Sequence, residues 1–274
     1  MKRIQVLAIF PTLLTLGNAV CGFTAIMLAT QATFDKPDPL FYAGLLIFGA
    51  MLFDMLDGSI ARLTNQASDF GQQLDSLCDV VSFGVAPAFI MLKLTDRFPA
   101  RMMVCLAVFY VLCAILRLAR FNVESHPDDG HSSFRGLPSP AAGGTIASLA
   151  IAMPGLFDLT TVERAEPFRD VIDHLISAVQ SCVPLLTVML ALLMVSRLRY
   201  SHVFNQLLRG KTPLPGIVQL LFALIAILSI HELAVPLIFL SFAFAAPARV
   251  LVALLLGQQN RAATLPPEQT SAVP

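Results

Sequence analysis

Apolar segments, each of about 20 residues, follow one another along almost the whole chain, and they constrain its fold more than any other feature. A helix needs a segment of this length to cross the hydrocarbon core of a bilayer. The composition agrees, because 56% of the 274 residues are hydrophobic and only 13% are charged, whereas soluble domains carry about 25% charged residues. We therefore expect an all-α, polytopic membrane protein.

The hydrophobic pattern predicts a helical bundle of about eight transmembrane helices. The predicted spans lie near residues 13–33, 40–62, 73–94, 101–121, 139–157, 174–195, 214–231 and 233–256. An interfacial N-terminal helix is expected over residues 1–12, separated by Pro11 from a transmembrane domain over residues 13–256. The polar, proline-containing tail over residues 257–274 is expected to be disordered.

The distribution of basic residues predicts the orientation. With the N-terminus in the cytoplasm and eight spans, Lys and Arg residues on the inner side outnumber those outside by two to one, as the positive-inside rule requires. Both termini then face the cytoplasm, and so does the turn between the second and third spans. We expect a multi-pass protein of the cell's inner membrane.

Charge balance and cysteine spacing exclude several kinds of partner and site. The 18 basic and 18 acidic residues balance. Because there is neither a basic stripe nor a glycine-rich phosphate loop, a nucleic-acid partner is not expected. The five cysteines are scattered without a C-x-x-C pair, which argues against a disulfide framework and a structural zinc site. They are expected to be buried and inert.

Four aspartates interrupt the apolar pattern. Asp54 and Asp57 lie near the end of the predicted span 40–62, and Asp75 and Asp79 lie near the start of the span 73–94. Residues three or four apart share a helix face, so each pair projects from one stripe. The segment between the pairs is long enough for two helices to face each other. We expect the carboxylates to converge in a cytoplasm-facing pocket near the membrane surface.

A divalent metal site accounts for this cluster. Four neighbouring carboxylates cannot all stay ionised without compensating cations, and oxygen-only ligands favour Mg²⁺ or Mn²⁺. Two such ions form the usual clamp for displacement at phosphorus. The alternative is helix capping or pairing with arginines, but intramembrane acids are usually functional. Gly58 and Ala61 leave room beside the aspartates, and Arg62 supplies a cation suited to phosphate.

The complete pattern resembles the signature of a known family, the CDP-alcohol phosphotransferases. The matching residues are Asp54-x-x-Asp57-Gly58-x-x-Ala61-Arg62, then eight residues, then Gly71-x-x-x-Asp75-x-x-x-Asp79. The resemblance implies that a CDP-linked lipid binds through its pyrophosphate to two metals, that an alcohol attacks the lipid-side phosphorus, and that CMP leaves. It also implies a catalytic core at about residues 13–195 and a homodimer.

The same resemblance assigns roles to individual residues. The implied metal ligands are Asp54, Asp57, Asp75 and Asp79. Asp79 is also the implied general base, which takes the proton from the attacking hydroxyl. The implied nucleotide-binding residues are Asp57, Gly58, Ala61, Arg62 and Gly71.

Flanking motifs bear on the identity of the alcohol. The segments "PTLLTLGNAVCGF" (11–23), "SLCDVVSFGVAPA" (76–88), "LRLARFNV" (116–123) and "FRGLPSPAA" (134–142) resemble membrane-embedded phosphatidylserine synthases of bacteria and fungi. Cys78 departs from that pattern, where alanine is more usual. The resemblance implies CDP-diacylglycerol and L-serine as substrates and phosphatidylserine and CMP as products, with the lipid tails remaining among the membrane lipids.

A serine acceptor brings a carboxylate and an ammonium group, so its pocket needs a cation and hydrogen-bonding groups. Three arginines lie at or after the inner end of the span 101–121: Arg117, Arg120 and Arg135. Each can form two parallel hydrogen bonds to a carboxylate. Simple anchoring at the lipid headgroups is the alternative for each arginine. Ser82 follows Asp75 by seven residues and is expected on the aspartate face. These four are the candidate serine-binding residues.

Two other functions fit parts of the sequence. An enzyme of the same family with glycerol 3-phosphate or inositol phosphate as acceptor would need more basic residues near the pocket. A divalent-cation-coupled transporter would use the aspartates as an ion site, but they lie at one turn rather than along a transmembrane path. The segment "HPDDGH" (126–131) contains metal-ligand residue types, and its polarity is more typical of a solvated loop.

Overall fold

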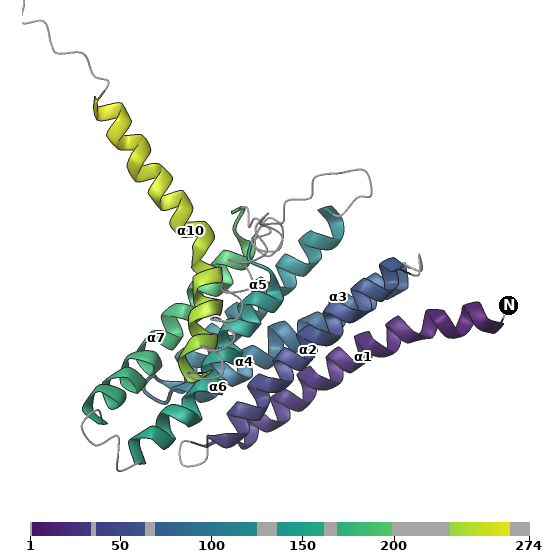
Figure 1. Ribbon diagram of the computed structural model, residues 1–274, viewed down its shortest axis with the longest axis horizontal. Coiled ribbons are helices and arrows are strands. Elements are labelled where there is room, and N and C mark those ends of the chain that lie inside the picture. The colour runs from purple at the N-terminus through teal and green to yellow at the C-terminus, as the bar shows by residue number, and fades with distance from the viewer. Residues whose placement is uncertain are drawn as a thin grey trace, which may run out of the picture.

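The regular elements in the described part of the chain are all helices. The computed structural model describes residues 2–33, 37–63, 69–124, 136–161, 169–198 and 231–263. The elements are α1 (Lys2–Gln31), α2 (Asp38–Leu63), α3 (Asp69–Asp79), the π-helix η1 (Val80–Val85), α4 (Ala86–Leu94), α5 (Ala100–Glu124), α6 (Ser139–Thr161), α7 (Arg169–Val195) and α10 (His231–Ala263). Figure 1 shows long helices lying side by side, with the last turns of α10 extending beyond the rest.

Six of the described helical segments are long and apolar enough to cross a membrane. They are Pro11–Gln31, Asp38–Ile60, Phe70–Leu94, Ala100–Val123, Ser139–Phe157 and Arg169–Val195. The predicted class of a polytopic helical membrane protein is thereby confirmed, and these segments coincide with the first six predicted spans. The seventh, 214–231, lies almost wholly outside the described residues, and the eighth falls in α10, whose apolar stretch Ala234–Val250 is shorter. The count of eight stays a prediction.

Two helix boundaries differ from what the sequence suggested. α1 is continuous through Pro11, so the backbone does not break between residues 1–12 and the first span; membrane helices tolerate an internal proline. α10 continues to Ala263, past Gly257, where the disordered tail was expected to begin. Gln, Arg and Ala near that end are good helix formers, so polarity alone does not end the helix. Residues 264–274 lie outside the described part.

α6 lies at the centre of the arrangement. It packs against α2, α4, α7 and α10, and it is the most buried of the six candidate spans. Its sequence explains this place, because residues 139–152, "SPAAGGTIASLAIA", are mostly small. Small residues let neighbouring helices approach closely, which is how helices associate in a membrane.

The second and third spans are both flanked by α1. α1 packs along α2 and also contacts α3, η1 and α4 (Figure 1). The helices α3, η1 and α4 form one continuous run from Asp69 to Leu94. A π-helix closes its hydrogen bonds over one residue more than an α-helix does, and one residue corresponds to about 100° of helix rotation. The π-helix therefore rotates the side-chain positions of α4 about the helix axis, relative to where an uninterrupted α-helix from α3 would place them.

Gly44 and Gly49 form a matched pair in α2 that tests the contact between α2 and α6. A Cβ at Gly44 would lie 2.7 Å from both the Ala147 carbonyl oxygen and Ile151 Cγ1 of α6. A Cβ at Gly49 would meet only Cys21 Sγ, at 3.7 Å. We expect Gly44→Ala to lower the free energy of unfolding by about 1–3 kcal/mol through overpacking. Gly49→Ala should raise it by about 0.5–1 kcal/mol, because alanine favours the helix.

Thermal unfolding of the two detergent-purified variants beside the wild type measures both effects. Equal midpoints for the two variants would contradict the close approach of α2 to α6 at Gly44.

Candidate metal and substrate site

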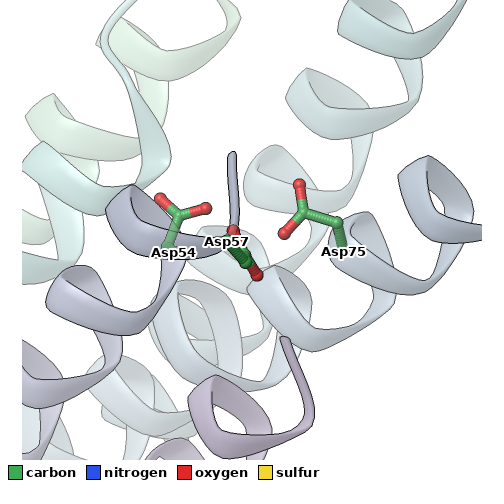
Figure 2. A group of neighbouring side chains, drawn as sticks. All are labelled: Asp54, Asp57 and Asp75. Carbon is green, nitrogen blue, oxygen red and sulfur yellow. The ribbon is translucent and has the colours of Figure 1, made fainter. Parts of the chain in front are cut away.

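Three of the four predicted aspartates converge in the structure. Asp54 and Asp57 come from α2 and Asp75 comes from α3, and Figure 2 shows their carboxylates turned toward a common space. One carboxylate oxygen of each lies within 4.8 Å of the other two. Asp57 is buried, whereas Asp54 and Asp75 are half-buried. Acids from two spans, one at the end of α2 and one in α3, thus come together.

The donor set of this group fits a hard divalent cation. Asp75 Oδ1 is buried and has no hydrogen-bond partner among the residues that the structure describes. An unsatisfied buried polar atom costs about 1–3 kcal/mol, and more when it is charged. A bound cation would supply the missing partner, and carboxylate oxygens are the ligands that Mg²⁺ uses. Asp54, Asp57 and Asp75 are therefore suited to hold such an ion.

Asp79, the fourth predicted aspartate, is not a member of the three-oxygen group. It is the last residue of α3, it is buried, and it lies within electrostatic range of Asp54 and Asp75. Its Oδ1 accepts a hydrogen bond from Asn18 Nδ2 of α1 at 3.0 Å. Asp79 is thus held from the side by another helix, close to the three-aspartate group.

α1 supplies hydrogen-bond donors that the sequence reasoning missed. Thr15 Oγ donates to Asp57 Oδ2 at 2.6 Å, beside the bond from Asn18 to Asp79. Both donor side chains are buried. Segment 11–23 was noted only for its resemblance, without a role for any residue. The available signal was the spacing of Thr15, Asn18 and Gly22, because residues three and seven apart lie on one helix face.

The predicted nucleotide-binding residues lie near the C-terminal end of α2 and the N-terminal end of α3. A Cβ built at Gly58 in α2 would meet no atom of the described residues within 4 Å, so the helix surface there borders open space among them. Ala61 and Arg62 lie in the last turn of α2, and Gly71 lies in the first turn of α3. The side chains of Ala61 and Arg62 lie outside the described part.

Among the candidate serine-binding residues, Arg117 is one whose positive charge interacts with the aspartates. It is buried in α5 and interacts electrostatically with Asp79 and Asp54. Its Nη1 donates to Ser139 Oγ at 2.6 Å, and its guanidinium carbon lies 5.7 Å from the centre of the Phe121 ring. One hydrogen bond leaves most of the five guanidinium N–H groups available to a ligand.

Arg120 and Ser82 have structural partners instead. Arg120 Nη1 donates to the Val195 carbonyl at 2.9 Å, at the end of α7, where an arginine satisfies carbonyl groups that a helix leaves open. The Ser82 hydroxyl is fully buried and donates to the main-chain carbonyl of Asn18 at 2.9 Å. Arg135 and the segment 126–131 lie outside the described residues.

The unsatisfied oxygen of Asp75 leads to a prediction about stability. In the presence of a chelator, we expect Asp75→Asn to raise the free energy of unfolding by about 1–3 kcal/mol, because the amide removes one charge and offers donors to neighbouring carboxylates. Added Mn²⁺ should stabilise the wild type and leave the variant unchanged.

Thermal unfolding with EDTA and with Mn²⁺ measures both effects. Asp173→Asn, at an exposed site in α7, is the control and should behave as the wild type in both conditions. A lower midpoint for Asp75→Asn in EDTA would contradict an unsatisfied carboxylate.

Comparison with known proteins relates this site to a described family. Residues 8–172 match the family model for CDP-alcohol phosphatidyltransferase. The matched segment contains the four aspartates, Asn18 and Arg117.

Three curated relatives are similar to parts of the chain. Archaetidylserine synthase of Methanothermobacter thermautotrophicus is 39% identical over 149 residues, which cover 54% of this chain and 60% of that protein. CDP-diacylglycerol–serine O-phosphatidyltransferase of Saccharomyces cerevisiae is 40% identical over 144 residues, or 50% and 51% of the two chains. The enzyme of that name from Helicobacter pylori strain 26695 is 31% identical over 199 residues, or 73% and 74%. The match thus spans between half and two thirds of the first two relatives.

Proposed function

This chain belongs to the CDP-alcohol phosphatidyltransferase family, and we propose that it transfers the phosphatidyl group of CDP-diacylglycerol to the hydroxyl of L-serine. The products are phosphatidylserine and CMP. The observation that carries this proposal is the group of three carboxylates within 4.8 Å, with an unsatisfied oxygen on Asp75. Carboxylates and phosphates repel each other because both are negatively charged. This group of carboxylates can therefore bind a phosphate-rich ligand only together with cations.

Two ions, Mg²⁺ or Mn²⁺, are proposed at the four aspartates. Bound there, they would neutralise the charge of the pyrophosphate and polarise its oxygens. Asp54, Asp57 and Asp75 hold the ions, and Asp79 contributes from the end of α3. The protein's part is to keep these side chains fixed, because phosphoryl transfer depends mainly on positioning and charge neutralisation.

Asp79 is proposed as the general base. The serine hydroxyl oxygen forms a bond to the lipid-side phosphorus, the bond from that phosphorus to the bridging oxygen breaks, and CMP leaves. Asp79 accepts the proton from the serine hydroxyl. Its position outside the group of three mutually close oxygens supports this role, because a carboxylate that the other aspartates share less closely keeps an oxygen lone pair for a proton while it also contributes to the ion site.

The nucleotide is proposed to lie along the end of α2. Open space at Gly58 supports this placement, since a bulky or flat group can approach the helix backbone there. Asp57, Ala61, Arg62 and Gly71 border the same end of the helix pair. Arg62 supplies a cation for the phosphates.

Serine as the acceptor is supported by the three relatives, each of which is named for serine or for a serine lipid. Arg117 is the proposed partner of the serine carboxylate among the described candidates, because its buried guanidinium interacts electrostatically with Asp79 and Asp54. Arg120 is committed to the end of α7 and Ser82 to the backbone of α1, which argues against a direct role for either. Arg135 remains a candidate.

The membrane setting completes the proposal. Six apolar spans support an enzyme embedded in a bilayer, where the lipid tails of the substrate stay among membrane lipids. We propose the inner membrane, with the site and both termini on the cytoplasmic side, and a homodimer as the assembly. Serine and CMP then exchange with the cytoplasm.

Release of CMP by the detergent-purified protein tests the function. With CDP-diacylglycerol and Mn²⁺, we expect CMP release that depends on serine and that disappears in Asp79→Asn, because the amide cannot accept the proton. Glycerol 3-phosphate and inositol phosphate, offered separately, should give no CMP.

The other outcomes separate the rival functions. CMP release with a different acceptor alone would keep the family and refute serine. No CMP with any acceptor, together with uptake of labelled Mn²⁺ into sealed vesicles, would favour the transporter.

Arg117 and Arg120 form a matched pair for the acceptor site. We expect Arg117→Lys to raise the KM for serine by about tenfold, because lysine cannot bind a carboxylate bidentately, and to leave the KM for CDP-diacylglycerol nearly unchanged. Arg120→Lys should instead lower the thermal midpoint with little effect on the KM for serine. Steady-state kinetics and thermal unfolding of both variants measure the two effects. The reverse pattern would move the acceptor site to Arg120.

A further inference from the structure

Asn18 makes two contacts with the segment that carries Asp79, one through its side chain and one through its backbone. Its Nδ2 donates to Asp79 Oδ1 at 3.0 Å, and its main-chain carbonyl accepts a hydrogen bond from the Ser82 hydroxyl at 2.9 Å. Asn18 and Ser82 are both fully buried. One residue of α1 therefore holds the end of α3 and the first turn of the π-helix η1.

The orientation of the Asn18 amide is determined by Asp79. Within the described part of the chain, Asn18 Oδ1 is buried without a hydrogen-bond partner, so the bond to Asp79 is the side-chain hydrogen bond that orients this amide. A buried asparagine with one unsatisfied oxygen costs stability, by about 1–3 kcal/mol. An apolar residue of similar size would avoid that cost. Packing alone therefore does not explain an asparagine at position 18. The hydrogen bond that its side-chain N–H donates to Asp79 explains it better.

The backbone contact depends on a close approach between α1 and η1. A Cβ at Gly22, one turn after Asn18, would lie 2.6 Å from Ser82 Cα, so the two main chains come together where glycine leaves room. On the other side of η1, the Tyr110 hydroxyl of α5 donates to the Phe83 carbonyl at 3.2 Å. The π-helix is thus held from α1 and from α5 directly after Asp79.

We propose that Asn18 is a positioning residue for Asp79, fixing both the rotation of its carboxylate and the turn of helix that carries it. This inference rests on the proposed function, in which Asp79 takes the proton of the acceptor hydroxyl. The torsion that rotates an aspartate carboxylate is soft, so a donor on an adjacent, packed helix is needed to hold it. Because Oδ1 already accepts a hydrogen bond from the amide, Oδ2 is the more basic oxygen and the one proposed to receive the proton.

A double-mutant cycle tests the coupling between Asn18 and Asp79. Asn18→Leu removes the donor at similar volume, and we expect it to lower kcat by about 10–100-fold while both substrate KM values stay within about threefold. Asp79→Glu keeps a carboxylate on a longer side chain, so turnover stays measurable while the Asn18 geometry is lost. In the Asp79→Glu background, Asn18→Leu should lower kcat by less than about threefold, because the interaction that it removes is already absent.

Two further variants complete the design. Ser82→Ala removes the hydrogen bond to the Asn18 carbonyl, and we expect a smaller loss of kcat, about three- to tenfold, that also disappears in the Asp79→Glu background. It tests the same coupling if Asn18→Leu fails to fold. Thr24→Val is the control, because the Thr24 hydroxyl is exposed on α1 and bonds only within its own helix, to the Val20 carbonyl; its kcat should equal that of the wild type.

The outcomes distinguish the inference from the proposed function. If Asn18→Leu lowers kcat by the same factor in the wild-type and Asp79→Glu backgrounds, the inference is wrong and the proposed function stands. An unchanged kcat in Asn18→Leu would contradict the inference in the same way. Absence of CMP release by the wild type with any acceptor would overturn the proposed function, and the inference with it.

Discussion

Electrostatic repulsion between close carboxylates is the constraint on which the rest of the structure depends. Oxygens of Asp54, Asp57 and Asp75 lie within 4.8 Å of one another inside a largely apolar helix bundle, where water screens charges poorly. Such a group is stable only if the helices that carry it cannot move apart. The packing of α1, α2 and α6 and the hydrogen bonds to the aspartates serve that requirement.

Several helices around the site together keep the aspartate-bearing helices in place. α6, with its small residues, lets α2 approach closely at Gly44 and so fixes the helix that carries two of the aspartates. α1 lies against both α2 and α3 and donates from Thr15 and Asn18. α5 contributes a buried cation, Arg117, which is tied to α6 through Ser139. The site therefore depends on five spans, those of α1, α2, α3, α5 and α6, although its acids come from two.

The sequence predicted the parts of this molecule that depend on spacing along one helix. Six apolar spans and the convergence of acids from α2 and α3 follow from helix periodicity and the length of the turn. The sequence could not predict what depends on contacts between distant segments. The spacing of Thr15, Asn18 and Gly22 marks one face of α1, but it does not say which aspartates that face contacts. The hydrogen bond from Arg120 to the end of α7 has no local signal. Periodicity placed Ser82 on the aspartate face, but it could not predict that the Ser82 hydroxyl donates to the main-chain carbonyl of Asn18 in α1.

The π-helix between α3 and α4 also limits how such a chain can change length during evolution. Turns between helices absorb an added or lost residue with little cost, whereas the run from Asp69 to Leu94 has no such freedom. Deleting one residue from Val80–Val85 would restore an ordinary α-helix and rotate the acidic face by about 100° relative to the buried face of α4. Insertions and deletions among descendants of this sequence should therefore be confined to the turns, and this run should keep its length even where its residues change.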